Sequence, residues 1–123
     1  MSVTKELHQL STDLYGELYT DDLYKNMYAT DASVYRKIPL AVAFPEGAED
    51  IKTLIDFASK QGISLVPRTA GTSLAGQCVG DGIIVDTSKN YTRILAFDEK
   101  NKTVRVEPGI VRDELNEFLK PFG

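Results

Sequence analysis

Several residue types that build common functional sites are scarce in this chain of 123 residues. It has one cysteine, Cys78, one histidine, His8, and no tryptophan. One cysteine cannot form an internal disulfide, and one cysteine with one histidine supplies too few ligands for a typical zinc site. No disulfide framework and no metal site are therefore expected, and cysteine usage favours a reducing, cytoplasmic location.

Positive charge is also scarce. The 14 basic residues face 18 acidic ones, which gives a net charge of -4, and no stretch gathers lysine and arginine into a patch. Nucleic acid and anionic membrane surfaces are therefore not expected as partners. The chain has no apolar leader segment and no run of about 18 apolar residues, so neither secretion nor a membrane span is expected.

The remaining composition is that of one globular domain. With 42% hydrophobic and 26% charged residues, the chain is neither disordered nor fibrous. A domain of this length buries roughly 65% of its unfolded surface, so it can fold without a disulfide or a metal ion.

The N-terminal region has the apolar spacing of helices. Four leucines are separated by three or four residues: Leu7, Leu10, Leu14 and Leu18. This spacing places them on one stripe, so a helix is expected from Val3 to Tyr19. Asp21 and Asp22 can cap a second, shorter helix, and residues 1–38 are expected to form an N-terminal helical segment. The tyrosines of this segment are interpreted as packing residues rather than a cofactor site: Tyr15, Tyr19, Tyr24 and Tyr28.

The next residues have the pattern of a strand, a helix and a strand. The apolar run from Leu40 to Phe44 predicts a strand that is buried on both faces. A helical period follows from Ala48 to Lys60, and a second apolar run extends from Ile63 to Pro67. This is the pattern of a right-handed crossover unit, so the two strands are expected to be parallel neighbours.

The last part of the chain predicts a third strand, a hairpin and a helix. Ile83 to Asp86 is another buried-strand run. Thr92–Phe97 and Thr103–Glu107 flank a polar turn, which predicts an antiparallel hairpin, and Val111–Leu119 has helical spacing. The expected fold class is α+β: a small parallel βαβ unit plus an antiparallel hairpin with flanking helices.

A loop of unusual composition follows the second predicted strand. Residues 68–82 include four glycines and no charged side chain between Arg68 and Asp81. Because little beyond each Cα obstructs access, successive backbone N–H groups can converge on an anion, and the Thr72 and Ser73 hydroxyls can add donors. The loop therefore predicts a phosphate site, in which Arg68 adds charge, holds backbone carbonyls or is a solvated residue at the strand end. On composition alone, a glycine-rich crossover without a ligand remains the alternative.

Two common phosphate-binding motifs do not match this loop. Residues 71–78, GTSLAGQC, have the glycine spacing of a P-loop, but Gln77 and Cys78 stand where a lysine and a serine or threonine are required. Gly80 and Gly82 are not followed by the third glycine of the dinucleotide pattern. A P-loop NTPase and a Rossmann site are therefore excluded.

No catalytic constellation is expected in this chain. Ser73 has no histidine near it in the sequence, so a Ser-His-Asp arrangement is excluded. Cys78 is interpreted as a small packing residue rather than a reactive thiol. Asp81 and Asp86 are interpreted as a turn former and a solvent-facing residue at a strand end.

Taken together, these segments resemble a family. The strings LVPRTAGTSLAGQ, GDGIIVD, TRIL and VRVEPGIVRDEL resemble the N-terminal FAD-binding subdomain of the vanillyl-alcohol oxidase and p-cresol methylhydroxylase superfamily. D-lactate and glycolate oxidase-like dehydrogenases are the most similar members. The resemblance implies FAD-dependent oxidation of a D-2-hydroxy acid such as lactate, glycolate or 2-hydroxyglutarate, with the flavin carrying the redox chemistry.

The resemblance also implies the cofactor contacts. In the family the loop after the second strand wraps the FAD pyrophosphate, and this role falls on Arg68, Thr69, Ala70, Gly71, Thr72, Ser73, Gly76 and Gln77, with Pro108 and Gly109 in a turn beside the cofactor. Thr69 and Ala70 replace two glycines of the common family version, which is tolerable only if neither residue needs a positive φ. Members that bind flavin covalently carry a histidine where this chain has Thr72, so FAD is expected to be noncovalent.

The family comparison further implies that more protein is needed for activity. Residues 39–123 correspond to the first part of the FAD-binding domain, without its second subdomain or the substrate domain. The chain is therefore expected to be a fragment that is inactive alone and that exposes an apolar face through which it self-associates. YATDASVYRKIPLAVAFPEGAEDI also resembles the start of large members that carry a C-terminal iron–sulfur region. The alternative is a noncatalytic truncated module whose loop is structural or binds another anion.

Overall fold

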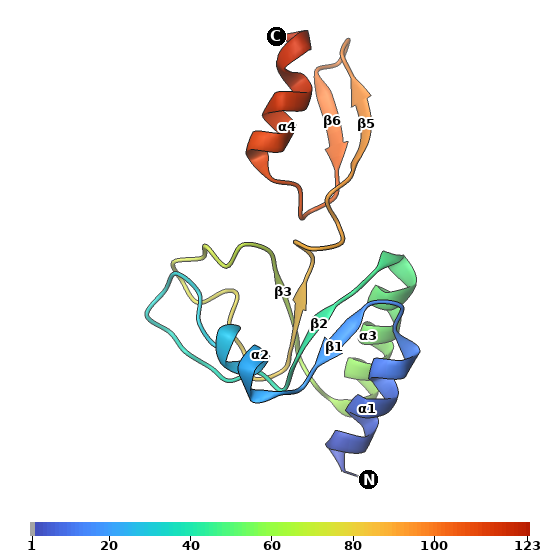
Figure 1. Ribbon diagram of the computed structural model, residues 1–123, viewed down its shortest axis with the longest axis vertical. Helices are drawn as coiled ribbons and strands as arrows, with labels where there is room; N and C mark the ends of the chain where they lie inside the picture. Colours follow the sequence, from blue (N-terminus) through green and yellow to red (C-terminus); the bar gives the residue numbers. More distant parts are fainter. Residues whose placement is uncertain (1) are drawn as a thin grey trace.

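The computed structural model describes residues 2–123 as a four-stranded sheet flanked by helices, with a separate two-stranded hairpin (Figure 1). The sheet contains β1 (Glu17–Tyr19), β2 (Ala41–Phe44), β3 (Leu65–Arg68) and β4 (Ile83–Asp86) in the order β1–β2–β4–β3. The helices beside the sheet are α1 (Val3–Asp13), α2 (Asp22–Met27) and α3 (Gly47–Gln61). The C-terminal part contains β5 (Ile94–Asp98), β6 (Thr103–Val106), α4 (Arg112–Leu119) and a 3-10 turn, Lys120–Phe122. These elements confirm the predicted α+β class.

The two central strands are buried on both faces, as their continuous apolar runs predict. Every residue of β2 and of β4 is buried. One face packs against α1 and α3 through a cluster of Leu7, Leu10, Leu14, Ala41, Ala43, Leu54, Ile83 and Val85. On the other face, Val42, Phe44 and Ile84 pack against Tyr19, Tyr24 and Tyr28. Three of the four tyrosines are therefore packing residues, whereas Tyr15 is 79% exposed.

The first helix is shorter than the leucine spacing predicts. α1 ends at Asp13, and the chain turns at Gly16 into β1, which pairs antiparallel with β2. A Cβ atom on Gly16 would lie 2.0 Å from the carbonyl oxygen of Phe44, so only glycine permits this approach. The prediction of a helix to Tyr19 is wrong because Leu18, which continues the helical spacing, packs on the same core from a strand.

The two strands of the crossover unit are parallel but are not neighbours. β4 lies between them and pairs in parallel with both β2 and β3. The connection between β3 and β4 contains no helix, and it returns the chain to the centre of the sheet. The prediction that β2 and β3 are adjacent is therefore wrong, because the more apolar run, IIVD, takes the central position.

One buried carboxylate joins three segments of the chain. Asp50 of α3 is 1% exposed. Its Oδ1 accepts the amide of Tyr15 at 2.9 Å, and its Oδ2 accepts the amides of Gly16 and Glu46, both at 2.8 Å. It therefore fixes the α1–β1 connection against the first turn of α3, a role that the sequence analysis did not identify.

Replacing this carboxylate should destabilise the domain. In Asp50→Asn the side-chain amide can accept through only one oxygen, which leaves buried N–H groups without an acceptor, and the expected loss is about 3 kcal/mol in the free energy of unfolding. Urea denaturation measures it. Asp56→Asn on the same helix, where the side chain is 64% exposed, is the matched control and should change stability by less than about 0.5 kcal/mol. Equal stabilities of the two variants would contradict this role.

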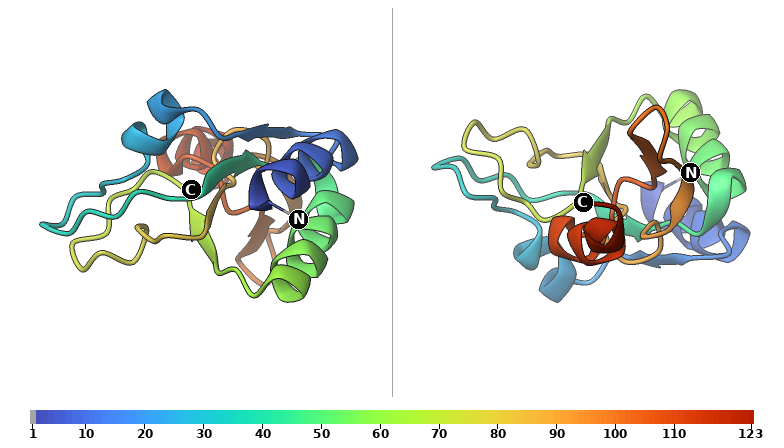
Figure 2. Two further views of the ribbon diagram at one scale, coloured as in Figure 1. Left: turned by 90° about the horizontal axis from the view of Figure 1, so that it is seen from below. Right: turned by 90° about the horizontal axis from the view of Figure 1, so that it is seen from above.

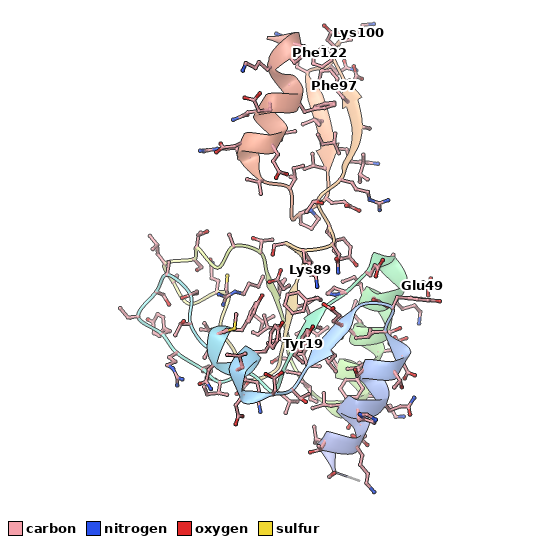
Figure 3. All side chains as sticks on the ribbon, in the orientation of Figure 1. Tyr19, Glu49, Lys89, Phe97, Lys100 and Phe122 are labelled. Atoms are coloured by element: carbon pink, nitrogen blue, oxygen red, sulfur yellow. The ribbon has the colours of Figure 1, made fainter. Side chains whose placement is uncertain are left out.

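The hairpin and α4 form a C-terminal module, residues 94–122, which stands apart from the sheet (Figure 1). Phe97 and Phe122 face each other within it, with ring centroids 4.7 Å apart (Figure 3). At its base, the Glu107 carboxylate accepts the Arg93 amide at 2.9 Å and its guanidinium at 2.8 Å, and these bonds hold the pKa of Glu107 below its usual range. The predicted hairpin and last helix are confirmed.

Within residues 2–123, no helix has both the length and the apolar composition to cross a membrane.

Candidate cofactor site

The glycine-rich loop, residues 69–82, leaves the carboxyl end of β3 and extends away from the sheet. The segment of residues 29–39 extends beside it, and the two are side by side in both views of Figure 2. Ligands of parallel α/β sheets bind beyond the carboxyl ends of the strands. This loop is therefore the candidate site.

The first half of the loop presents a run of free backbone donors. Within residues 2–123, the N–H groups of the five residues from Ala70 to Leu74 donate to no protein acceptor. These residues are exposed or half-buried, so the donors are accessible. Successive N–H groups without a protein acceptor can bind an anion where they converge.

The residues that replace family glycines do not strain this backbone. In the described part of the chain, Lys102 is the only non-glycine residue with a positive φ. Thr69 and Ala70 therefore meet the condition set above. Gly71 has a φ of 68° and does need the freedom of glycine.

The hydroxyl of Ser73 is engaged within the loop. It accepts the amides of Ala75 at 3.2 Å and of Gln77 at 3.3 Å, and it donates to Oε1 of Gln77 at 3.1 Å. Ser73 and Gln77 therefore hold the second half of the loop together. The adjacent Thr72 is exposed, which leaves its hydroxyl accessible as a donor.

Arg68 holds backbone carbonyls on both sides of the site. Its Nη1 donates to the Thr30 oxygen at 2.7 Å and to the Cys78 oxygen at 3.4 Å, and its guanidinium lies 4.9 Å from the ring centroid of Tyr28. A Cβ on Gly71 would lie 2.5 Å from Nη2. Of the three roles that the sequence left open, the structure shows the carbonyl contacts, and the positive charge lies beside the backbone at Gly71.

Asp86, at the end of β4, holds the side chain of Tyr28, over whose ring the Arg68 guanidinium lies. The sequence-based interpretation of Asp86 as solvent-facing is wrong, because Asp86 is 3% exposed. Its carboxylate accepts the Tyr28 hydroxyl at 2.5 Å, and the amide and hydroxyl of Ser88 at 2.7 and 2.6 Å. Burial, and then this contact with Asp86, raise the pKa of Tyr28 far above its usual range. In the sequence, the string DTS follows an apolar run and allows this local turn, so it could have indicated that Asp86 bonds to Ser88.

Pro108 and Gly109 lie at the same edge of the sheet, against the residues that follow β4. The Gly109 amide donates to the Tyr91 oxygen at 2.7 Å, and a Cβ on Gly109 would lie 2.3 Å from the Thr87 oxygen. The Thr87 amide in turn donates to the Arg68 oxygen at 3.0 Å. The turn and the loop therefore border the same region through Thr87.

A pocket of about 380 Å³ lies where the loop meets the neighbouring segment. From one segment it is lined by Tyr35, Arg36 and Lys37, and from the loop by Ala75, Gly76, Val79 and Gly80. A Cβ on Gly76 would lie 2.7 Å from the Tyr35 ring, so this glycine permits the close contact between the two segments.

Residues 39–123 match the family model described as "FAD binding domain". The chain belongs to this family. D-2-hydroxyglutarate dehydrogenase of Haemophilus influenzae is 41% identical over 111 residues, which cover 88% of this chain and 11% of that protein. Glycolate oxidase subunit GlcD of Bacillus subtilis is 31% identical, over 89% of this chain and 24% of that protein. The chain thus spans only about a tenth to a quarter of the length of these relatives.

Solved structures show the same fold. The crystal structure of p-cresol methylhydroxylase with substrate bound superposes with a TM-score of 0.81 at 14% identity, over 96% of this chain and 24% of that one. The predicted fold is therefore confirmed, and the family match confirms the predicted FAD-binding domain. The chain's only histidine, His8, is exposed on α1, outside the family match, and Thr72 lies in the loop.

Displacing the loop backbone at Gly71 should weaken FAD binding. Gly71→Ala places a Cβ against the Arg68 guanidinium at a φ that side chains rarely adopt, so we expect FAD affinity in the full-length protein to fall by at least about tenfold. Gly62→Ala is the control, because Gly62 has a similar φ of 64° but open space around it, away from the loop. Fluorescence titration with FAD separates the two. Tight FAD binding by Gly71→Ala would show that the loop is misassigned.

Proposed function

We propose that this domain holds the FAD pyrophosphate noncovalently with residues 68–77, as part of a flavin-dependent oxidoreductase that oxidises a D-2-hydroxy acid. The run of five free amides from Ala70 to Leu74 carries the proposal. It offers successive donors of one polarity next to a positive charge, which suits two linked phosphate groups.

Each loop residue has a distinct part in this proposal. The amides of Ala70 to Leu74 donate to phosphate oxygens, and the Thr72 hydroxyl adds a side-chain donor. Arg68 supports the negative charge from behind the loop while it keeps its contacts to two carbonyls. Thr69, Gly76 and Gln77 shape the loop, and Pro108 with Gly109 borders the cofactor at the sheet edge.

The chemistry of the proposed reaction belongs to the flavin, which accepts a hydride equivalent from the α-carbon of the hydroxy acid. The printed names of the relatives, D-2-hydroxyglutarate dehydrogenase and glycolate oxidase subunit, support this substrate class. Because this chain corresponds to a minor share of those proteins, we assign substrate binding and catalysis to residues outside it. The 123 residues alone are then inactive.

We propose a division at residue 39, where the family match begins. Residues 1–38 form the N-terminal segment, to which the structure adds β1 as an edge strand of the sheet. Residues 39–123 form the N-terminal part of the FAD-binding domain. A cytoplasmic location is part of the same proposal, and the free thiol of Cys78 is consistent with a reducing compartment.

The full-length protein provides the test. It should show the visible absorption of oxidised flavin, release FAD on denaturation, and lose that absorption when D-2-hydroxyglutarate is added without oxygen. The L-enantiomer is the control and should leave the flavin oxidised. A colourless protein that takes up no added FAD would contradict the proposal and leave a structural loop, or one for another anion, as its role.

For the 123-residue chain alone we propose self-association through the C-terminal module. Four apolar side chains there are 41–53% exposed: Leu95, Val111, Phe118 and Phe122. Such a patch favours association. Sedimentation should show concentration-dependent dimers or larger species, which Phe118→Ser with Phe122→Ser should remove. A monomer at all concentrations would contradict this proposal.

A further inference from the structure

A segment just before the residues that match the family model contacts the glycine-rich loop near both ends of that loop. Thr30, Asp31 and Ala32 lie outside residues 39–123, yet each is hydrogen-bonded to residues 68–78. The Thr30 oxygen accepts Arg68, and the Ala32 amide donates to the Gly71 oxygen at 3.0 Å. These three consecutive residues, called here the brace, fix the loop from one side.

Asp31 is the side chain on which the brace depends. Its Oδ2 accepts the Cys78 amide at 3.4 Å, and its Oδ1 accepts the amide of Ser33 at 2.8 Å as well as the Ser33 hydroxyl. The Ser33 hydroxyl contact is the main cause that holds the pKa of Asp31 below its usual range, so the group is ionised at neutral pH. It therefore links the far end of the loop, at Cys78, to the turn that orients Ala32.

The bond from Ala32 determines which way a loop donor points. In a trans peptide the C=O and the following N–H point in opposite directions. Because the Gly71 oxygen faces the brace, the N–H of Thr72 faces away from it, toward the accessible side of the loop. The same contact that engages the Gly71 carbonyl therefore presents the central donor of the free run.

We propose that Asp31 is a positioning residue for the FAD pyrophosphate: through Cys78 and Ala32 it holds the loop in the conformation that presents the free amides. This inference rests on the proposed function. It extends the cofactor site beyond the family match, to a residue that does not touch the cofactor.

Charge and positioning predict opposite effects at Asp31. A carboxylate near a pyrophosphate repels it, so removing the charge would strengthen FAD binding if electrostatics alone mattered. If Asp31 positions the loop, removing the charge weakens FAD binding, because the loop amides are no longer held in place. The direction of the change therefore distinguishes the two roles.

The test is the FAD dissociation constant of the full-length protein carrying Asp31→Asn. We expect it to rise by about tenfold, since one charged acceptor of a preorganised loop is lost. Asp81→Asn is the matched control: it removes the same charge at the end of the same loop, where the side chain is 74% exposed and contacts Lys37. It should leave FAD affinity within about twofold, because exposed ion pairs contribute little. The melting temperature of each apoprotein shows whether the fold is retained.

The outcomes separate this inference from the proposed function. If wild-type protein binds no FAD, the proposed function fails. If wild type binds FAD and Asp31→Asn binds it equally well or more tightly, the positioning role is overturned while the proposed function stands. Should Asp31→Asn not fold, Ser33→Ala decides, because it removes the hydroxyl contact to Asp31 and should weaken FAD binding about threefold. Unchanged affinity in that variant overturns the role.

Discussion

The contacts of the Arg68 guanidinium are the constraint on which the site depends. One nitrogen holds carbonyls of Thr30 and Cys78, and the charge lies against the backbone at Gly71. These contacts fix the path of a loop that has no helix or strand, and the amides of Ala70 to Leu74 remain free for a ligand. A loop whose amides were paired internally would have no donors to offer, and an unfixed loop would lose more conformational entropy on binding.

The rest of the fold serves to place this arginine. Parallel pairing of β3 with β4 brings Arg68 opposite Asp86, whose carboxylate holds the Tyr28 hydroxyl while the Tyr28 ring lies under the guanidinium. Tyr28 in turn packs on Phe44 at the end of β2, with ring centroids 5.9 Å apart. The aromatic face of the sheet, the buried carboxylate and the loop are therefore one connected structure, and the segment before the family match is part of it.

Local patterns in the sequence predict the elements but not their neighbours. The apolar runs at β2 and β4, the small-residue loop and the hairpin are visible in the sequence because each depends on residues close together in the chain. Three features depend on distant residues: the turn at Gly16 against Phe44, the central place of β4, and the buried role of Asp86. The same holds in the site, where the loop is predicted but Asp31, which lies 47 positions from its partner Cys78, is not.

In the proposed site, the amides of Ala70 to Leu74 bind the FAD pyrophosphate. Hydrogen–deuterium exchange of the full-length protein, measured with and without FAD, tests it most directly. FAD should slow exchange across residues 70–74, where N–H groups lack protein acceptors, while α1 and the outer face of α3 are unaffected. Unchanged exchange in that segment of a protein that binds FAD would show that these amides do not hold the cofactor.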